Sequence, residues 1–370
     1  MTDPSGPAAP EHADPGLPGV SYVMPVLNEV THVEAAIASL LDQDYTGPFD
    51  VIVALGPSID GTTELVERLS AVDPRIRVIE NPTGSTPSGL NVAIGASRYP
   101  VVVRVDAHSL LPRDYTRVAV EALVRTDAAN VGGIMKAEGT TAFERAVAHA
   151  YGSKAGLGGG AHHVGGEEGP AETVYLGVFQ RDWLTKVGLF NEDIRRGQDW
   201  ELNRRLREAG GTVWFTPRLV VIYRPRPSLE RLARQFFSTG LWRGELARRF
   251  FTANALKYFV PPVMVTVAVL GLLLGIAGLV TLAVAGGDPA SDGGPDTART
   301  VGAVLTAGFV VPLVYLLFVA VAALGAARSQ GARAGAWFLV VLPCIHFSWG
   351  LGFILGFLKL TKNITAHTGR

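Results

Sequence analysis

The chain has 370 residues, with 33 basic and 33 acidic side chains, 48% hydrophobic residues and a single cysteine, Cys344. One cysteine cannot form a disulfide within the chain, and zero net charge argues against a globally basic nucleic-acid binder. The charge is uneven, because residues 1–260 carry 27 basic and 30 acidic side chains and residues 261–370 carry 6 and 3. A polar, enzyme-sized region therefore precedes an apolar one.

The first 18 residues are rich in proline, alanine and aspartate and contain no apolar run, which predicts a disordered tail and no signal peptide. After them, short β-branched runs alternate with segments of helical periodicity. Strands are expected at 20–26, 51–55, 76–79 and 99–105, and helices at 33–41, 63–70, 90–96 and 110–118. This alternation predicts βαβ units and a mainly parallel sheet.

Polar side chains follow several of the expected strands. They are Pro25, Asn28 and Glu29 after the first strand, Asp60 after the second, and Asp106 and His108 after the valine-rich one. Ligands of open α/β sheets bind beyond the carboxyl ends of the strands, so these residues are expected to converge on one edge. Neither the dinucleotide-binding glycine fingerprint nor the P-loop occurs in the sequence.

Four spaced motifs carry a resemblance to a known family. They are VMPVLNE at 23–29, SIDGT at 58–62, DAH at 106–108 and GQDWELNRRLREAGG at 197–211. In this order they resemble the family 2 glycosyltransferases, which have a GT-A fold, a Rossmann-like α/β domain. Among these, the chain is most similar to membrane-anchored, succinoglycan-type exopolysaccharide glucosyltransferases. The resemblance extends over about residues 20–250.

The resemblance implies roles for the DAH element. Asp106 and His108 would hold a divalent metal, and Asp106 would also contact the nucleotide. Mn²⁺ or Mg²⁺ is expected, and an imidazole ligand favours Mn²⁺ somewhat. Pro25, Asn28, Glu29 and Asp60 are the further candidates for the donor pocket. From the residues alone, Asp106 could instead cap the helix expected at 110–118, and Asp60 could belong to a turn.

Asp199 is the candidate general base, at the place where the family usually has Glu-Asp and this chain has Gln198-Asp199. An inverting transfer needs one carboxylate that takes the proton of the acceptor hydroxyl. The alternative is that Asp199 only caps its helix. Glu201 is expected on a solvated or salt-bridged face with Arg204 and Arg205.

One departure from the family pattern affects the nucleobase. Leu55-Gly56 occupies the place where relatives usually carry two aspartates, so a UDP-sugar is only the default donor. The glycine-rich segment 156–169 contains His162 and His163 and is expected to be either a flap over the substrates or a plain surface loop. A third metal ligand from these histidines stays an open alternative.

A basic segment precedes the apolar region. Residues 218–257 carry nine basic and two acidic side chains, and 229–250 shows helical amphipathic periodicity. This pattern predicts a helix on an anionic membrane leaflet, in contact with lipids, or alternatively one packed against the catalytic domain.

Residues 263–286 and 301–326 are long and apolar enough to cross a membrane, whereas 334–358 is interrupted by Pro343 and two glycines. Basic residues before the first span and aspartates after it predict that the N-terminal domain lies in the cytoplasm, at the inner cell membrane. Lys359 and Lys362 do not fit three full passes, so the last segment is expected to be a third span or to be re-entrant or interfacial.

The expected organisation is therefore a tail at 1–18, a GT-A catalytic domain at 19–227, amphipathic juxtamembrane helices at 228–260 and a membrane domain at 261–370. The expected activity is inverting, metal-dependent transfer of a sugar from a nucleotide-diphosphate donor to a lipid-linked or glycan acceptor, in polysaccharide or cell-envelope biosynthesis. The alternative is a catalytically idle membrane scaffold that binds nucleotide sugars.

Overall fold

The computed structural model describes residues 16–158, 160–194, 196–251, 256, 258–286 and 297–360. Residues 1–15 of the expected tail lie outside this range, as does Lys362. The contacts divide the chain into two compact units. The catalytic unit comprises residues up to Ala137 together with Leu157–Tyr223, and the membrane unit comprises Glu138–Gly156 together with the chain from Arg224 onward.

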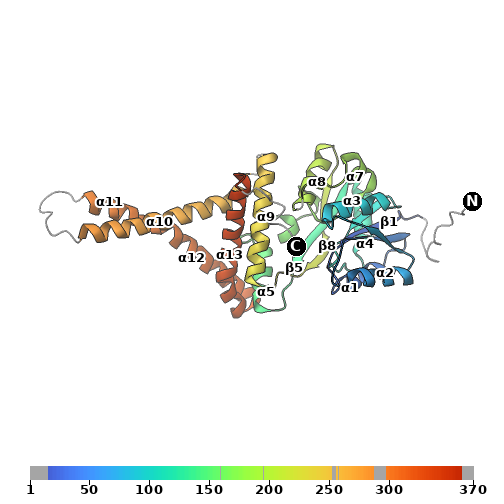
Figure 1. Ribbon diagram of the computed structural model, residues 1–370, viewed down its shortest axis with the longest axis horizontal. Helices are drawn as coiled ribbons and strands as arrows, with labels where there is room; N and C mark the ends of the chain where they lie inside the picture. Colours follow the sequence, from blue (N-terminus) through green and yellow to red (C-terminus); the bar gives the residue numbers. More distant parts are fainter. Residues whose placement is uncertain are drawn as a thin grey trace, which may run out of the picture. The chain divides into compact units, whose positions relative to one another are not determined.

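In the described part of the catalytic unit, eight strands form one mixed sheet (Figure 1). The strands are β1 Val20–Val26, β2 Phe49–Leu55, β3 Ile76–Glu80, β4 Val101–Arg104, β5 Asn130–Ala137, β6 Gly169–Pro170, β7 Tyr175–Gln180 and β8 Val213–Tyr223. Their order is β3-β2-β1-β4-β7-β5-β8-β6. β1 pairs in parallel with β2 and β4, whereas β7 runs antiparallel between β4 and β5. The predicted parallel core is confirmed, and β7 adds an antiparallel strand to it.

Along the strands, the side chains that point to either face of the sheet are apolar. Helices therefore cover both faces. Tyr22 and Met24 face a core shared with α1 Val33–Leu41 and α4 Tyr115–Thr126, and Val23 faces the opposite core. The remaining helices of the unit are α2 Thr62–Val72, α3 Thr86–Ala96, α6 Ala161–Val164, α7 Arg181–Val187 and α8 Gln198–Glu208. Strands buried on both faces are typical of parallel sheets.

One helix begins later than expected. The sequence predicts a helix at 110–118, but α4 begins at Tyr115 with Asp114 as its N-cap residue. The intervening residues make a bridge to β8 through Leu110 and Ile222. Asp106 therefore does not cap this helix, and the capping interpretation of Asp106 is wrong.

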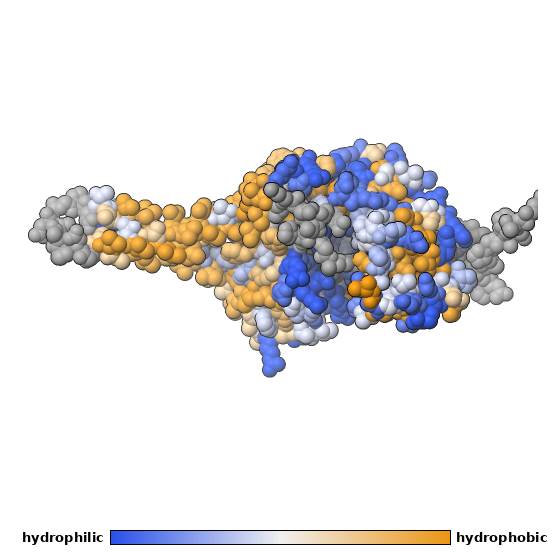
Figure 2. Space-filling view, viewed as in Figure 1, coloured by the Kyte–Doolittle hydropathy of each residue, from blue (hydrophilic) through white to orange (hydrophobic). Residues whose placement is uncertain are grey.

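The membrane unit is helical. Its elements are α5 Ala142–Tyr151, α9 Leu229–Arg249, α10 Val260–Gly286, α11 Thr297–Thr306, a 3₁₀ turn at Ala307–Phe309, α12 Val310–Gln330 and α13 Ala332–Phe357. Within the residues that the structure describes, three segments are long and apolar enough to cross a membrane: Val260–Ala285, Thr297–Gln330 and Ala332–Phe357. Large hydrophobic side chains are exposed along α10 and α12, where Figure 2 shows an almost continuous hydrophobic surface.

Helix α5 was not expected in this unit. The sequence predicts one catalytic domain over 19–227, yet Glu138–Gly156 packs with the membrane helices. Phe143 of α5 makes an edge-to-face contact with Trp337 of α13, and His149 makes one with Phe338, at ring-centroid distances of 5.3 and 5.2 Å. The second unit thus receives a helix from the middle of the catalytic sequence.

Helices α9 and α13 pack closely through glycines (Figure 1). A Cβ atom on Gly244 would lie 2.2 Å from the carbonyl oxygen of Phe353, and one on Gly356 would lie 2.0 Å from that of Leu241. Only glycine permits such an approach of two helix backbones. Pro343 does not interrupt α13, which is continuous over 26 residues.

Candidate functional site

The loops after β1 and β2 are held together by hydrogen bonds between them. The Asn28 side-chain oxygen accepts from the backbone N–H of Ile59 at 2.9 Å, and the Ser58 hydroxyl accepts from the Asn28 N–H at 3.0 Å. One Asp60 oxygen accepts from the Val30 N–H at 3.2 Å and the other from the Thr62 hydroxyl at 2.5 Å. The hydrogen bond from Thr62 lowers the pKa of the exposed Asp60 carboxyl. The turn role of Asp60 is thus observed, and its contact with a donor stays a prediction.

Glu29 and His108 meet across the edge of the sheet. The backbone N–H of Glu29 donates to the Thr62 hydroxyl at 2.9 Å, which fixes the residue at the start of its loop. Its carboxylate lies 3.2 Å from Nδ1 of His108. A carboxylate only accepts, so Nδ1 carries the proton and Nε2 is the nitrogen that can bind a metal. Pro25 lies within β1 and is buried.

Arg104, the last residue of β4, joins two of the predicted functional carboxylates. Its Nη2 donates to Asp106 at 3.0 Å, and its Nη1 makes a short contact with a carboxylate oxygen of Asp199. The Arg104 side chain is 8% exposed, against 18% for the Asp106 side chain and 37% for that of Asp199. Burial alone would lower the pKa of Arg104, but Asp106 and Asp199 outweigh it and hold that pKa above its ordinary value. Arg104 therefore stays charged.

Tyr175 of β7 completes the surroundings of Asp106. Burial, together with the negative charge of Asp106, raises the pKa of Tyr175 well above its ordinary value, and a hydrogen bond with Ser109 opposes the shift only in part. The phenol is consequently a neutral hydroxyl at any physiological pH. Asp106 thus pairs with a permanent cation, and its charge acts on a phenol that stays neutral.

Asp199 occupies the first turn of α8 without capping it. The N-cap residue is Gly197, with a φ of +78°, and it has no side chain to cap with. This backbone conformation suits glycine. Asp199 is the second helical residue, where the dipole of the helix favours a negative charge. The interpretation of Asp199 as a mere helix cap is therefore wrong, because its carboxylate contacts Arg104 instead.

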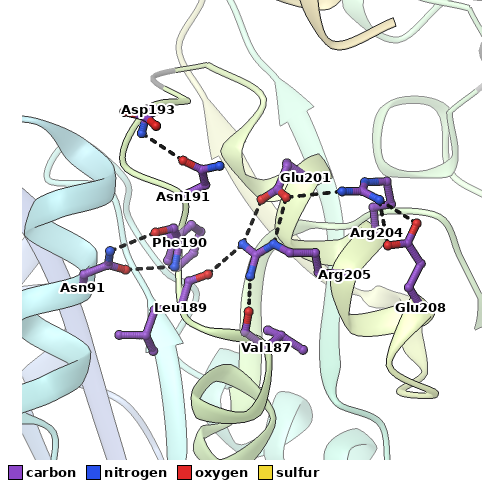
Figure 3. A network of polar contacts seen from close by, with 10 residues as sticks. All are labelled: Asn91, Val187, Leu189, Phe190, Asn191, Asp193, Glu201, Arg204, Arg205 and Glu208. Atoms are coloured by element: carbon purple, nitrogen blue, oxygen red, sulfur yellow. Dashed lines mark hydrogen bonds and ion pairs between the residues drawn. The ribbon is translucent and has the colours of Figure 1, made fainter. Parts of the chain in front are cut away.

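A network of charged groups anchors α8 to the loop that precedes it (Figure 3). Glu201 is only 3% exposed, and its two oxygens accept from Nε and Nη2 of Arg205, both at 2.8 Å. Arg205 also donates to the carbonyl of Leu189 at 2.7 Å, and Asn91 of α3 bonds to both backbone groups of Phe190. Glu201 is salt-bridged as expected, but it is buried and not solvated. The helix carrying Asp199 is thereby fixed to its surroundings.

The glycine-rich segment contains a single turn of helix, α6, with both histidines. The ring centroids of His162 and His163 lie 4.2 Å apart. The pKa of His163 is lowered to about 3, mainly by burial and to a smaller extent by the neighbouring His162. His163 is therefore neutral at physiological pH. A third metal ligand from this segment stays a prediction.

The residues at the sheet edge can supply only some of the ligands of a divalent cation. Among the residues that the structure describes, no group of three histidine, cysteine, aspartate or glutamate side chains is arranged to hold a metal. Asp106 offers a carboxylate and His108 an imidazole, and Glu29 orients that imidazole. Such a pair fits an ion that takes its other ligands from phosphate oxygens and water, which is how Mg²⁺ usually binds in phosphate sites.

The structure therefore brings Asp106 and Asp199 together through Arg104, and Glu29 and His108 through their own contact. Asn28 and Asp60 lie in the loops that neighbour Glu29. Sequence reasoning gave Arg104 no role, although a charged residue inside the run Val101 to Val105 signals a buried charge with a partner. Tyr175 carried no comparable signal.

Comparison with known proteins identifies the chain's relatives. The family model described as "Glycosyl transferase family 2" matches residues 21–188. The succinoglycan biosynthesis protein ExoA of Rhizobium meliloti is 32% identical over 256 residues, which are 69% of this chain and 77% of that protein. A Methanococcus voltae glucuronosyltransferase, named for dolichyl N-acetyl-α-D-glucosaminyl phosphate, is 23% identical over 62% of this chain and 74% of its own length.

Among solved structures, the mannosyltransferase PcManGT of Pyrobaculum calidifontis, in complex with GDP-Man and Mn²⁺, is similar to this chain. It has a TM-score of 0.57 and 18% identity, and the match covers 96% of this chain and 92% of that one. The likeness shows the GT-A fold. With the expected motifs, the fold and the relatives in agreement, the chain belongs to the family 2 glycosyltransferases and is a hexosyltransferase-type enzyme.

Proposed function

We propose that the enzyme transfers a sugar, with inversion, from a nucleotide-diphosphate donor to an acceptor hydroxyl deprotonated by Asp199. The observation that carries this proposal is the bridge from Arg104 to both Asp106 and Asp199. Asp106, predicted for the donor side, and Asp199, predicted for the acceptor side, both contact the guanidinium of Arg104. An inverting transfer requires a base and a leaving group on opposite sides of one anomeric carbon.

The residues of the chain have separate tasks in this reaction. Asp199, more than one-third exposed, takes the acceptor proton onto its carboxylate as the hydroxyl attacks. Arg104 holds that carboxylate in place and balances its charge. Glu201 and Arg205 fix the helix from which Asp199 projects (Figure 3). A base held in this way needs little reorganisation when the acceptor arrives.

A divalent cation, Mn²⁺ or Mg²⁺, would be held by Asp106 and His108, with Glu29 orienting the imidazole. When bound, such an ion neutralises charge on the leaving diphosphate. The Mn²⁺ in the PcManGT complex supports this assignment by analogy. The donor class is a nucleotide-diphosphate sugar, with UDP as the default base, because Leu55-Gly56 leaves the base undetermined.

The acceptor is a lipid-linked or glycan hydroxyl, and the role is in polysaccharide or glycoconjugate biosynthesis. The names of two relatives support it, since one concerns succinoglycan and the other a dolichyl-phosphate-linked sugar. The membrane-length helices support an enzyme that works at a membrane. The charge distribution around the first span favours the cytoplasmic face of the inner membrane.

The test is the substitution Asp199→Asn in the full-length protein. We expect the rate of sugar transfer to fall by about 10²–10⁴-fold, because a general base contributes that much. Donor binding, measured by calorimetry with Mn²⁺, should stay within about twofold, since Asp199 is placed on the acceptor side. Asp182→Asn, an exposed carboxylate on α7, is the matched control and should leave both quantities unchanged.

Unchanged transfer by Asp199→Asn would rule out the assigned base. A His108→Ala variant tests the metal assignment separately, because it should raise the Mn²⁺ concentration required for donor binding without changing the Asp199 step. If the wild-type protein bound nucleotide sugars with Mn²⁺ but transferred none of them to any lipid-linked or glycan acceptor, the idle-scaffold alternative would be favoured.

A further inference from the structure

The middle of α13 is in contact with non-helical backbone. His346 lies near the midpoint of this helix, and its Nε2 is 2.8 Å from the carbonyl oxygen of Ala155, in the loop that follows α5. Its Nδ1 lies 3.1 Å from the Tyr315 hydroxyl of α12. If α13 crossed a bilayer, this loop would lie near the bilayer centre. Irregular backbone is disfavoured in the hydrocarbon core, where no water satisfies its polar groups.

The charged start of α9 meets the same part of α13. The Cys344 sulfur lies 3.9 Å from the carbonyl of Leu229, the first residue of α9. Glu230 follows directly, and its ion pair with Arg234 has side chains 79% and 70% exposed. In a spanning α13, these exposed charges would also lie near the bilayer centre. Charged side chains at that depth face a protein interior or a water-filled cavity, not lipid.

The length of α9 leads to the same conclusion. The two helices run in parallel, since Gly240 meets Trp349 and Gly244 meets Phe353. Between Arg234 and Arg243, α9 has only eight residues without a charge, Gln235–Trp242. At 1.5 Å per residue they cover about 12 Å, far less than the roughly 30 Å of a hydrocarbon core. Helix α9 is therefore too short in its uncharged part to cross a bilayer beside a spanning α13.

The direction and burial of α13 differ from those of the other apolar helices. In Figure 1, α13 runs alongside α9 and crosses α10 at a steep angle. Within its most apolar window, 44% of α13 is buried, against 28% for α10 and 17% for the segment Thr297–Gln330. A helix covered by other helices along much of its length exposes less of its surface to lipid than a simple span does.

Gly278 and Gly271 of α10 meet Thr306 and Gly308, so Tyr315, seven residues after Gly308, is level with the start of α10. We infer that, among the apolar helices of the described residues, only α10 and the part of Thr297–Gln330 that runs beside it cross the hydrocarbon core, and that α13 lies in the membrane interface with α9 and α5. Trp337, Val340 and Leu351 are exposed and recur at helical spacing on one face of α13. This face fits the boundary between headgroups and acyl chains of a lipid surface, where amphipathic platforms bind. The chain beyond α13 then returns to the side from which it entered at Val260. That topology explains why Lys359 follows the last apolar segment.

Labelling of single cysteines tests the topology, because Cys344→Ala yields a cysteine-free full-length protein. Into this background, cysteine is placed at Leu360 after α13, at Ala298 at the start of α11, and at Val72 on α2, all exposed positions. In sealed vesicles of one orientation, a membrane-impermeant maleimide should label Leu360→Cys and Val72→Cys from the same face. Ala298→Cys should react only from the opposite face. Labelling of Leu360→Cys from the same face as Ala298→Cys would overturn the inference.

A depth measurement separates an interfacial α13 from one that dips into the core. Bimane is attached to Val340→Cys, Leu351→Cys or Leu273→Cys, the last near the middle of α10, in vesicles of brominated phosphatidylcholine. We expect bromine near the headgroup to quench the two α13 positions at least twice as strongly as bromine near the chain end, and the reverse at Leu273. Equally deep quenching at all three positions would contradict an interfacial α13.

Discussion

The two units of this enzyme hold their helices and strands together by different means. In the catalytic unit, buried charges join distant segments: Arg104 connects the end of β4 to α8, and Glu201 connects α8 to its preceding loop through Arg205. In the membrane unit, glycines let backbones touch, as Gly271 of α10 does where a Cβ atom would lie 2.7 Å from the carbonyl oxygen of Gly308. Where apolar burial drives folding, buried charges can position a site, whereas helices among lipids gain little from burial and depend on close packing.

The largest expected effect comes from removing the buried cation. Arg104→Met leaves Asp106 and Asp199 close together without their shared partner, and breaking a buried ion pair in this way costs about 3–5 kcal/mol. Because Asp199 is partly exposed, we expect a loss near the lower end of that range. Thermal unfolding of the purified full-length protein, followed by tryptophan fluorescence, measures it.

Arg104→Lys is the control, because it keeps the charge but cannot donate to both carboxylates with a fixed fork. It should recover part of the stability and less of the transfer rate. Equal stability of the Met variant and wild type would show that the Arg104 bridge contributes nothing to the fold.

A matched pair of glutamates on α8 gives the next effect. Glu201→Gln removes a carboxylate that is 3% exposed and bonded to Arg205, and should destabilise the protein by about 2 kcal/mol. Glu208→Gln removes one that is 58% exposed and pairs with Arg204, and should cost less than about 0.5 kcal/mol. The same unfolding measurement compares the two. Equal losses would mean that burial does not set the strength of these pairs.

Close packing in the membrane unit predicts a smaller effect. Gly244→Ala places a methyl group 2.2 Å from a backbone oxygen, and overpacking of about 1–3 kcal/mol is offset by the helix propensity that alanine adds. A net loss of about 1 kcal/mol is expected. Gly325→Ala in α12, with nothing within 4 Å, should be neutral or slightly stabilising. Thermal stability in detergent distinguishes them, and a neutral Gly244→Ala would contradict the described contact.

The smallest effect is expected at Asp60, in the turn after β2. The Thr62 hydroxyl lowers the pKa of this carboxyl from its ordinary 3.8. A depressed folded-state pKa contributes stability that is fully present above pH 3.8 and is lost as pH falls through the lower value. The difference in melting temperature between wild type and Asp60→Asn should therefore be present at pH 6 and shrink as the pH falls below 3.8. A difference that grew on acidification would contradict this sign.

Much of the candidate site could be predicted from the sequence. Asp106 and His108 follow a valine-rich strand and Asp199 lies in the first turn of a helix after a glycine, so local pattern and family motif both indicated their places. Arg104 received no role because its partner Asp199 lies 95 residues away, and one sequence does not show which distant carboxylate pairs with a buried cation. The helix expected at 110–118 began late, since the bridge from Leu110 to β8 also depends on a distant strand.

The membership of α5 in the membrane unit could not be predicted for a similar reason. Its apolar face, with Phe143, Ala146, Val147 and Ala150 buried, has the period of any amphipathic helix, and its partner α13 lies far along the chain. The sequence predicted the apolar helices themselves, because length and hydropathy are local properties. Which of them lie beside one another depends on contacts that no local pattern records.

The helices α5 and α13 are far apart in the sequence, and this separation has a consequence during synthesis. Tyr151, the last residue of α5, is made roughly 180 residues before Ala332, the first residue of α13. At a synthesis rate of about 5–20 residues per second, the apolar face of α5 is without its partner α13 for on the order of 10–40 s. The strands β7 and β8 emerge in that interval, so the sheet can close while α5 remains without its final packing. Transiently exposed apolar surface favours aggregation, so we expect a membrane surface or a chaperone to cover that face of α5 in the meantime.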